Sequence, residues 1–125
     1  MNESRMQVIV VEPGKEAELR EIGSGLESLQ EAVGGGIEAV YPYKDPVAIV
    51  CNEEGKLDGL PLNRALRDED GYIYDVIAGT FLVVGLTEDN FGSLSDELAE
   101  RYLECFRQPE VFLQANGRIV VVKNG

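Results

Sequence analysis

Short apolar runs separated by glycine, proline, asparagine and aspartate predict that much of this chain folds into β-strands. Residues 6–11 form a mostly β-branched run of strand length. A turn sequence, Glu12–Lys15, ends the run. We therefore expect residues 17–22 to return beside it as a hairpin.

Further strands are expected in the middle of the chain. Residues 37–43 and 47–52 are rich in β-branched and aromatic side chains, and the short link between them favours an antiparallel pair. Residues 72–77 and 80–86 are expected to form two more strands. The second of these is almost purely apolar, which is typical of a central strand.

Turn residues divide the remaining segments. Asn116-Gly117 lies between the expected strands 111–115 and 118–122, and it predicts a hairpin because both turn positions must accept a positive φ. By contrast, residues 57–71 have no regular pattern and contain two Asp-Gly turn signals. We expect this segment to be a structured loop with one helical turn.

Two segments have the periodicity of amphipathic helices. The first follows Ser24–Glu27, which has the spacing of a capping box, and glycines 34–36 are expected to end it. The second spans residues 95–107, where Leu94, Leu98, Tyr102, Cys105 and Phe106 share one face. Together these elements predict one α+β domain over residues 1–125, with a mostly antiparallel sheet and both helices packed on one face of it.

Net charge narrows the choice of partners. The chain of 125 residues has 23 acidic and 11 basic residues, for a net charge of −12. Such a chain is not expected to bind nucleic acid directly or to adhere to anionic lipid. No run of about 18 apolar residues and no signal-peptide core is present, so we expect a cytoplasmic protein.

The residue types present also restrict the chemistry. The chain has no histidine, which excludes Ser-His-Asp catalysis and histidine-ligated zinc. Cys51 and Cys105 are far apart in sequence, and both are expected to be reduced and buried among apolar neighbours. We therefore expect no metal and no cofactor.

A pair of arginines offers a candidate binding surface in the irregular segment. Arg64 and Arg67, beside Asn63, lie three residues apart and would share one side of a helical turn, where they could clamp a carboxylate or phosphate. The alternative is local ion pairing with Asp68, Glu69 and Asp70, worth only about 0–1 kcal/mol. Tyr41 and Tyr43 are expected to lie near this surface.

The second expected helix has an acidic face formed by Asp96, Glu97, Glu100 and Glu104. Three of these carboxylates, at positions 96, 100 and 104, repeat about every 6 Å, which is near the spacing of phosphates in nucleic acid. This stripe predicts a DNA-mimicking inhibitor as one alternative function. The other interpretation is the solvated face of an amphipathic helix, partly neutralised by Arg101 and Arg107.

Several sequence phrases follow one another in a fixed order: Val10–Lys15, Leu26–Gln30 with Val33–Gly35, Asp45–Lys56, Gly59–Leu66 and Ile77–Phe81. Together they resemble the bacterial domain-of-unknown-function family 3846. The resemblance covers about residues 6–95, and the helix and hairpin of residues 95–125 are less diagnostic. It implies a small cytoplasmic protein of gut-type bacteria, often carried on phages and conjugative elements. It implies no catalytic residues, but the Asn63-Arg64 phrase is where it would place a binding surface.

These observations favour a non-enzymatic binding or regulatory module that engages a protein or a small anion. Its expected surface comprises residues 60–70 with Tyr41 and Tyr43. The acidic DNA mimic is a second hypothesis. A small enzyme that uses carboxylates alone is a third, because a chain with 23 acids always offers candidate pairs. The sequence leaves the oligomeric state open.

Overall fold

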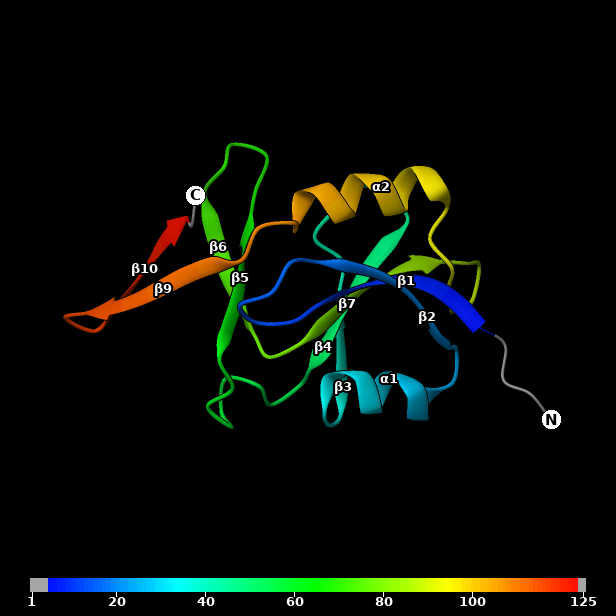
Figure 1. Cartoon of the computed structure of the whole chain (residues 1–125), viewed down its shortest axis with the longest axis horizontal. Helices are drawn as coiled ribbons and strands as arrows, with labels where there is room; N and C mark the ends of the chain where they lie inside the picture. Colours follow the sequence, from blue (N-terminus) through cyan, green and yellow to red (C-terminus); the bar gives the residue numbers. More distant parts are fainter. Residues whose placement is uncertain (1–4, 124–125) are drawn as a thin grey trace.

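A computed structural model describes residues 5–123 and confirms the α+β class with a mostly antiparallel sheet. Across this range two helices and ten strands follow one another (Figure 1). Their order and bounds are β1 (Arg5–Val11), β2 (Glu18–Gly23), α1 (Leu26–Val33), β3 (Ile37–Val40), β4 (Val47–Asn52), β5 (Leu62–Arg67), β6 (Ile73–Ala78), β7 (Phe81–Leu86), β8 (Phe91–Gly92), α2 (Asp96–Cys105), β9 (Glu110–Ala115) and β10 (Arg118–Lys123).

The main sheet has the strand order β2-β1-β7-β4-β3, and β8 pairs with the end of β7. Every pairing in it is antiparallel. The expected hairpin β1–β2, the pair β3–β4 and the central position of β7 are all confirmed. Strands β1, β4 and β7 are buried almost throughout, because each lies inside the sheet and is covered on both faces.

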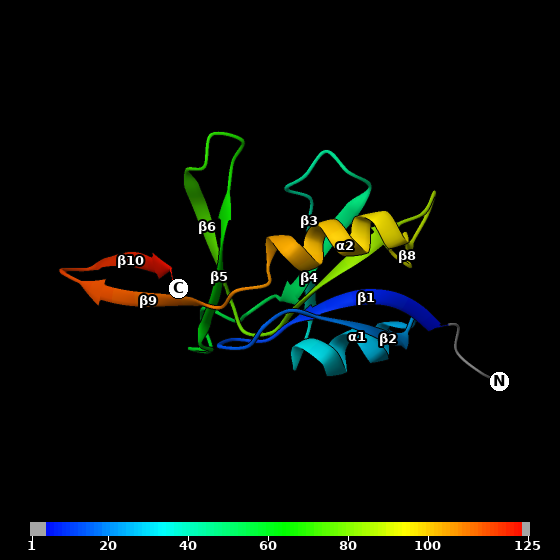
Figure 2. The same cartoon turned by 45° about the horizontal axis from the view of Figure 1, so that its top comes forward.

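The two helices cover opposite faces of this sheet, so the expectation that both lie on one face is wrong (Figures 1 and 2). Alternate strand residues point to opposite sides. Ile9, Ile49 and Val83 pack with α2, whereas Val8, Val50 and Val84 pack with α1. A single helical layer would have left half of these apolar side chains in water.

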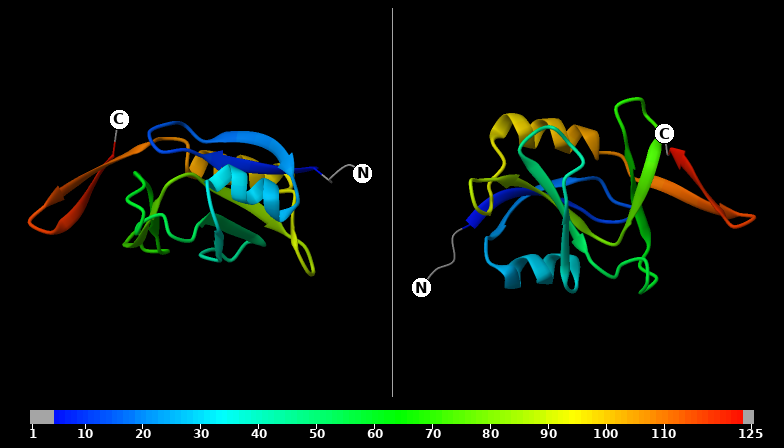
Figure 3. Two further views of the ribbon diagram at one scale, coloured as in Figure 1. Left: turned by 90° about the horizontal axis from the view of Figure 1, so that it is seen from below. Right: turned by 180° about the vertical axis from the view of Figure 1, so that it is seen from behind.

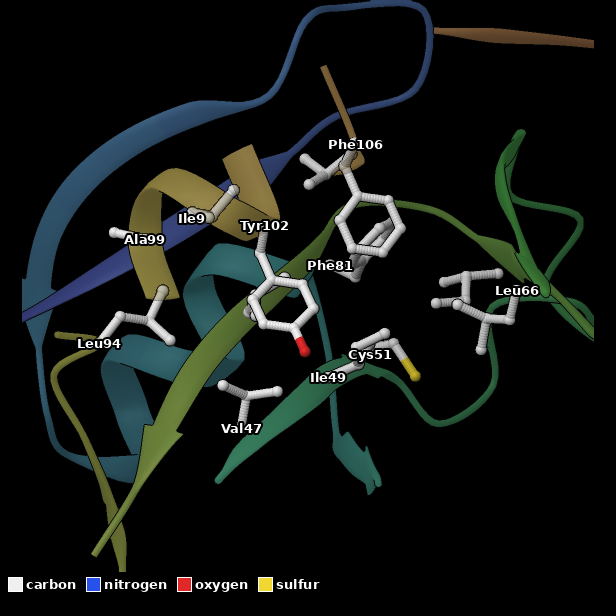
Figure 4. Close-up of a cluster of buried hydrophobic side chains, with 13 residues drawn as sticks. Ile9, Val47, Ile49, Cys51, Leu66, Phe81, Leu94, Ala99, Tyr102 and Phe106 are labelled. Atoms are coloured by element: carbon white, nitrogen blue, oxygen red, sulfur yellow. The ribbon is translucent and has the colours of Figure 1, made fainter. Parts of the chain in front are cut away.

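The core beneath α2 contains the larger aromatic side chains (Figure 4). Phe106 meets Phe81 edge to face, with ring centroids 5.2 Å apart and planes at 81°. Tyr102 covers Val47 and Ile49. This cluster also includes Leu66 and Ile77, which join the smaller sheet to the main one.

Residues 57–71 do not form the expected loop with a helical turn. Residues 62–67 form β5, which pairs antiparallel with β6 in a separate two-stranded sheet. The pairing is interrupted by register shifts after Leu62 and after Leu66. Because Asn63, Arg64, Ala65 and Leu66 are all buried, the strand lacks the polar and apolar alternation that would have revealed it.

The hairpin β9–β10 forms as expected around Asn116 and Gly117, whose φ angles are +52° and +76°. It extends away from the main sheet (Figures 1 and 3). Its base, near Glu110, lies against β5. The hairpin is a second small sheet of only two strands.

The helix ends differ in how they are capped. The capping box predicted at Ser24 is wrong, because Gly25 occupies the N-cap position of α1. Gly34 ends α1 in the left-handed conformation, at φ +80°, as predicted. In α2 the Ser95 hydroxyl caps the first turn by accepting from the Leu98 amide, and the helix ends at residue 105 rather than 107.

The two cysteines have different environments. Cys51 is buried as expected, but the expectation that Cys105 is buried is wrong, since its side chain is exposed. Both are free thiols. No helix in the described part of the chain is long and apolar enough to cross a bilayer.

Candidate functional site

Two of the predicted binding residues lie inside the protein. Asn63 and Arg64 are 0% and 1% exposed, so neither can meet a partner at the surface. Their positions on β5 place them under the end of α2 and the β1–β2 turn. The pair of exposed guanidinium groups expected on one helical turn does not exist.

Arg64 joins three segments of backbone. Its Nη2 donates to the carbonyls of Lys15 at 2.7 Å and Phe106 at 2.9 Å, and its Nη1 donates to the side-chain oxygen of Asn63 at 2.8 Å. Among the described residues no carboxylate forms an ion pair with it. Burial lowers the pKa of Arg64, although the guanidinium remains charged at neutral pH.

Asn63 holds this arginine in place. Its amide nitrogen donates to the carbonyls of Val11 at 2.9 Å and Gly79 at 2.8 Å, which leaves its oxygen facing Arg64. All polar atoms of the pair are therefore engaged within the fold. The Asn63-Arg64 phrase links β5 to β1, to the β1–β2 and β6–β7 turns and to the end of α2, rather than forming a surface.

A pocket of about 380 Å³ lies beside this buried pair, between the end of α2, β5 and the start of β9. We call it the α2–β5 pocket. It is lined by side chains that include Tyr43, Arg64, Arg67, Cys105, Phe106, Pro109 and Glu110. Tyr43, Arg64 and Arg67 of the predicted surface all line this pocket. The end of α2 and residues 108–110 line it too, and the sequence did not place them here.

Arg67 and Glu110 form an ion pair in the wall of this pocket. Arg67 Nη2 lies 2.7 Å from Glu110 Oε2, and the glutamate side chain is only 8% exposed. The other carboxylate oxygen, Oε1, accepts from the Ala65 amide at 2.9 Å. Glu110 therefore fixes β9 against β5 and orients the guanidinium of Arg67.

Tyr43 also lines the pocket. Its ring centroid is 5.0 Å from that of Tyr102, with the planes tilted by 47°. Burial raises the pKa of Tyr43, so its hydroxyl stays protonated. Asp45 supports this arrangement by accepting at 2.7 Å from both Tyr102 and Arg101, and these bonds lower the pKa of its carboxyl group.

Cys105 is the nucleophilic group at this pocket. Its thiol lies near the Tyr43 hydroxyl, and partial desolvation by the surrounding walls raises its pKa. Cys51 lies elsewhere, on β4 beside β3, where burial raises its pKa to about 11. Neither thiol is activated, because each is held in its neutral form at pH 7.

The remaining residues of the predicted surface lie outside the pocket. Asp68 builds the β5–β6 turn by accepting from the amides of Asp70 and Tyr72. The alternative prediction that Arg64 and Arg67 pair with this acidic turn is also wrong, because Arg67 pairs with Glu110. Tyr41 is exposed and does not line the pocket.

The residues of the predicted acidic face, Asp96, Glu97, Glu100 and Glu104, lie on α2 and are all exposed. Arg107 pairs with Glu104 at 2.6 Å, and Gln7 donates to Asp96 at 3.2 Å. These contacts interrupt the negative stripe at both ends. A nucleic-acid mimic at this face stays a prediction.

Sequence reasoning missed Glu110 and Cys105 as parts of the site. Glu110 precedes an expected strand and resembles any surface acid in the sequence. Cys105 occupies an apolar position of the helix pattern. Only the packing of α2 and β9 against β5 reveals that both face the same pocket.

Comparison with known proteins supports the family resemblance. The model of the family described as a domain of unknown function, DUF3846, matches residues 6–107. No curated protein and no solved structure was found to be similar. The match spans the chain from β1 through α2, including the pocket residues up to Phe106, and stops before β9. The chain therefore belongs to the DUF3846 family.

Proposed function

We propose that this protein is a binding module whose α2–β5 pocket takes a small molecule, or a peptide group, that carries a carboxylate on an apolar body. The main support for this proposal is the balance of charged side chains in the pocket lining. Arg64, Arg67, Glu104 and Glu110 line the pocket, but Glu110 pairs with Arg67, and Glu104 pairs with Arg107, which is not a lining residue. Arg64 is therefore left without an acidic partner among the described residues, in a protein whose net charge is −12.

The two arginines would act differently on a bound anion. Arg64 is fully engaged with backbone and Asn63 oxygens, so it contributes only its field, which burial strengthens. Arg67 has five N–H donors, and the contact with Glu110 occupies its Nη2 group. Its other donors could bind a carboxylate directly.

The apolar side of the pocket supports an organic anion rather than a bare ion. Phe106, Pro109 and the Tyr43 ring contribute carbon surface to the pocket lining. The volume of about 380 Å³ lies within the roughly 300–1,000 Å³ typical of small-molecule sites. Glu104 at the rim is paired with Arg107, so it does not cancel the charge inside.

Benzoate tests this proposal because it combines one carboxylate with one ring. In a titration followed by amide NMR, benzoate is expected to shift the resonances of Arg67, Cys105 and Glu110, whereas the neutral isostere benzamide shifts them far less. Bound benzoate should also slow the modification of Cys105 by a thiol reagent, because that side chain lies at the pocket.

A matched pair of variants isolates the guanidinium of Arg67. Arg67→Met is expected to weaken benzoate binding at least tenfold, since a hydrogen bond to a charged group contributes about 1.5–3 kcal/mol. Arg20→Met on β2 removes an exposed arginine that is also ion-paired, with Glu12 and Glu18, but does not line the pocket, and it should leave binding unchanged. Equal shifts with benzoate and benzamide, or equal binding by Arg67→Met and the parent, would rule out the proposed site.

A further inference from the structure

The hairpin β9–β10 leaves one complete face of apolar side chains in water. In its register Val120 lies opposite Leu113, and Val122 lies opposite Val111, so the four side chains share a face. Each of them is between 42% and 55% exposed. A two-stranded sheet is marginally stable in water by itself, and an uncovered aliphatic face makes it less so.

The other face of the hairpin is turned toward the body of the same chain. Ile119 lines a groove with Leu60, Leu62, Ile73 and Tyr74. Phe112 lines a second hollow with Pro13 and other residues at the base. The opposite face has one exposed large aliphatic side chain, Ile119 at 46%, whereas the face that contains Val120 has four, although Val111 also borders the second hollow. The face that contains Val120 is therefore the larger apolar surface left for another molecule.

Charge indicates what this molecule is like. Residues 111–125 contain Arg118 and Lys123 and no acid, so they carry +2, and residues 1–110 carry the remaining −14. The hairpin is thus an apolar and basic segment attached to an acidic body. It fits a surface that is apolar and acidic.

The same chain presents such a surface on β6 and the turn before it. Tyr72, Ile73 and Tyr74 are exposed there, at 72%, 44% and 55%. Four acidic residues lie in the same turn and strand, namely Asp68, Glu69, Asp70 and Asp75. Glu69 pairs with Lys44 and Asp75 pairs with Lys56, so the acidic charge of this surface comes from Asp68 and Asp70. Apolar area and opposite charge therefore occur on two separate surfaces of one molecule.

From these two surfaces we infer that the protein forms a symmetric dimer in which the hairpin of each copy packs its Val111, Leu113, Val120 and Val122 face on the β6 surface of the other copy. A twofold axis makes both contacts at once, because each copy supplies one hairpin and one acidic surface. The contact covers apolar side chains on both elements and places Arg118 near carboxylates. It is independent of the α2–β5 pocket.

Analytical ultracentrifugation of the full chain, up to about 200 µM, tests the dimer directly, because this range detects dimers with dissociation constants near micromolar. The parent is expected to sediment as a concentration-dependent dimer. Val120→Asp should shift the protein to a monomer. Leu19→Asp on β2 is the matched control, since Leu19 is 46% exposed and Val120 is 48% exposed, and it should leave the dimer intact.

Variants of the acidic surface distinguish this arrangement from simpler ones. Tyr74→Asp should weaken the dimer at least tenfold, as Val120→Asp does, and Arg118→Glu should weaken it more at low salt than at high salt. A parent that stays monomeric, or a dimer that survives Val120→Asp, overturns the inference. A dimer lost with Val120→Asp but kept with Tyr74→Asp also overturns it, because the hairpins would then pair with each other.

Discussion

Replacing Arg64 with methionine keeps most of the apolar stem of this side chain and removes its guanidinium. Three oxygens then lose short hydrogen bonds, namely the Lys15 carbonyl, the Phe106 carbonyl and the side-chain oxygen of Asn63. The Asn63 and Phe106 oxygens lie in buried bonds, and the Lys15 carbonyl in a partly buried one, beside a residue that is 1% exposed. The change therefore leaves at least two buried acceptors without donors.

The magnitude follows from two opposing contributions. Hydrogen bonds from a charged donor contribute about 1.5–3 kcal/mol each, so three of them amount to roughly 5–9 kcal/mol. Removing the charge recovers several kcal/mol of desolvation cost, which is on the order of half that sum. We expect a net loss of about 3 kcal/mol, a large part of the roughly 5–15 kcal/mol that stabilises a domain.

Urea unfolding of the parent and of Arg64→Met measures this loss as a lower midpoint with an unchanged slope. Arg64→Lys keeps the charge but not the planar set of donors, so its stability should be intermediate, and it serves if the methionine variant does not fold. Arg107→Met, at an exposed pair, is the control and should change stability by about 0.5 kcal/mol or less. A loss below about 1 kcal/mol for Arg64→Met would refute the structural role assigned to this residue.

Three further predictions concern the cysteines and the sheet. A thiol reagent should modify one cysteine in the folded protein and two after unfolding, because Cys105 is exposed and Cys51 is buried; rapid reaction of both in the folded state would contradict this packing. Stability should fall as the pH rises from about 9 toward about 11, because the unfolded chain ionises Cys51 at its ordinary pKa of 9.0 whereas folding raises that pKa to about 11. The urea midpoint of the parent minus that of Cys51→Val, followed against pH, isolates the contribution of this thiol. An equal pH dependence of the midpoint in both proteins would exclude that contribution. Gly85→Ala should lower the thermal midpoint far more than Gly36→Ala. Each added methyl would lie 2.3 Å from an oxygen atom. At Gly85 that oxygen belongs to the fixed backbone of Ser93, whereas at Gly36 it belongs to the Glu53 carboxylate, which can move away. Equal midpoints for the two variants would argue against this close contact at β7.

Local sequence alone determined most of the elements of the main sheet. The runs that form β1, β4 and β7 are apolar at nearly every position instead of alternating between polar and apolar residues, which identifies them as buried strands. Asn116-Gly117 imposes a turn whose φ angles few other residues accept. The same runs also contained the signal for cover on both faces, since a strand that is apolar at every position must be buried on both sides. A hydrophobic pattern states that a side chain is buried, but it does not state which helix buries it.

The tertiary structure alone decided the role of the arginines and the composition of the site. A charged side chain in an irregular segment is expected at the surface, because burying a charge is costly unless its hydrogen bonds are satisfied. At Arg64 those bonds come from Asn63, Lys15 and Phe106, which are up to 49 residues away, so no local pattern could predict them. Glu110 and Cys105 face the α2–β5 pocket for the same reason: their neighbours are set by how α2 and β9 pack on β5, a contact between segments that are distant along the chain.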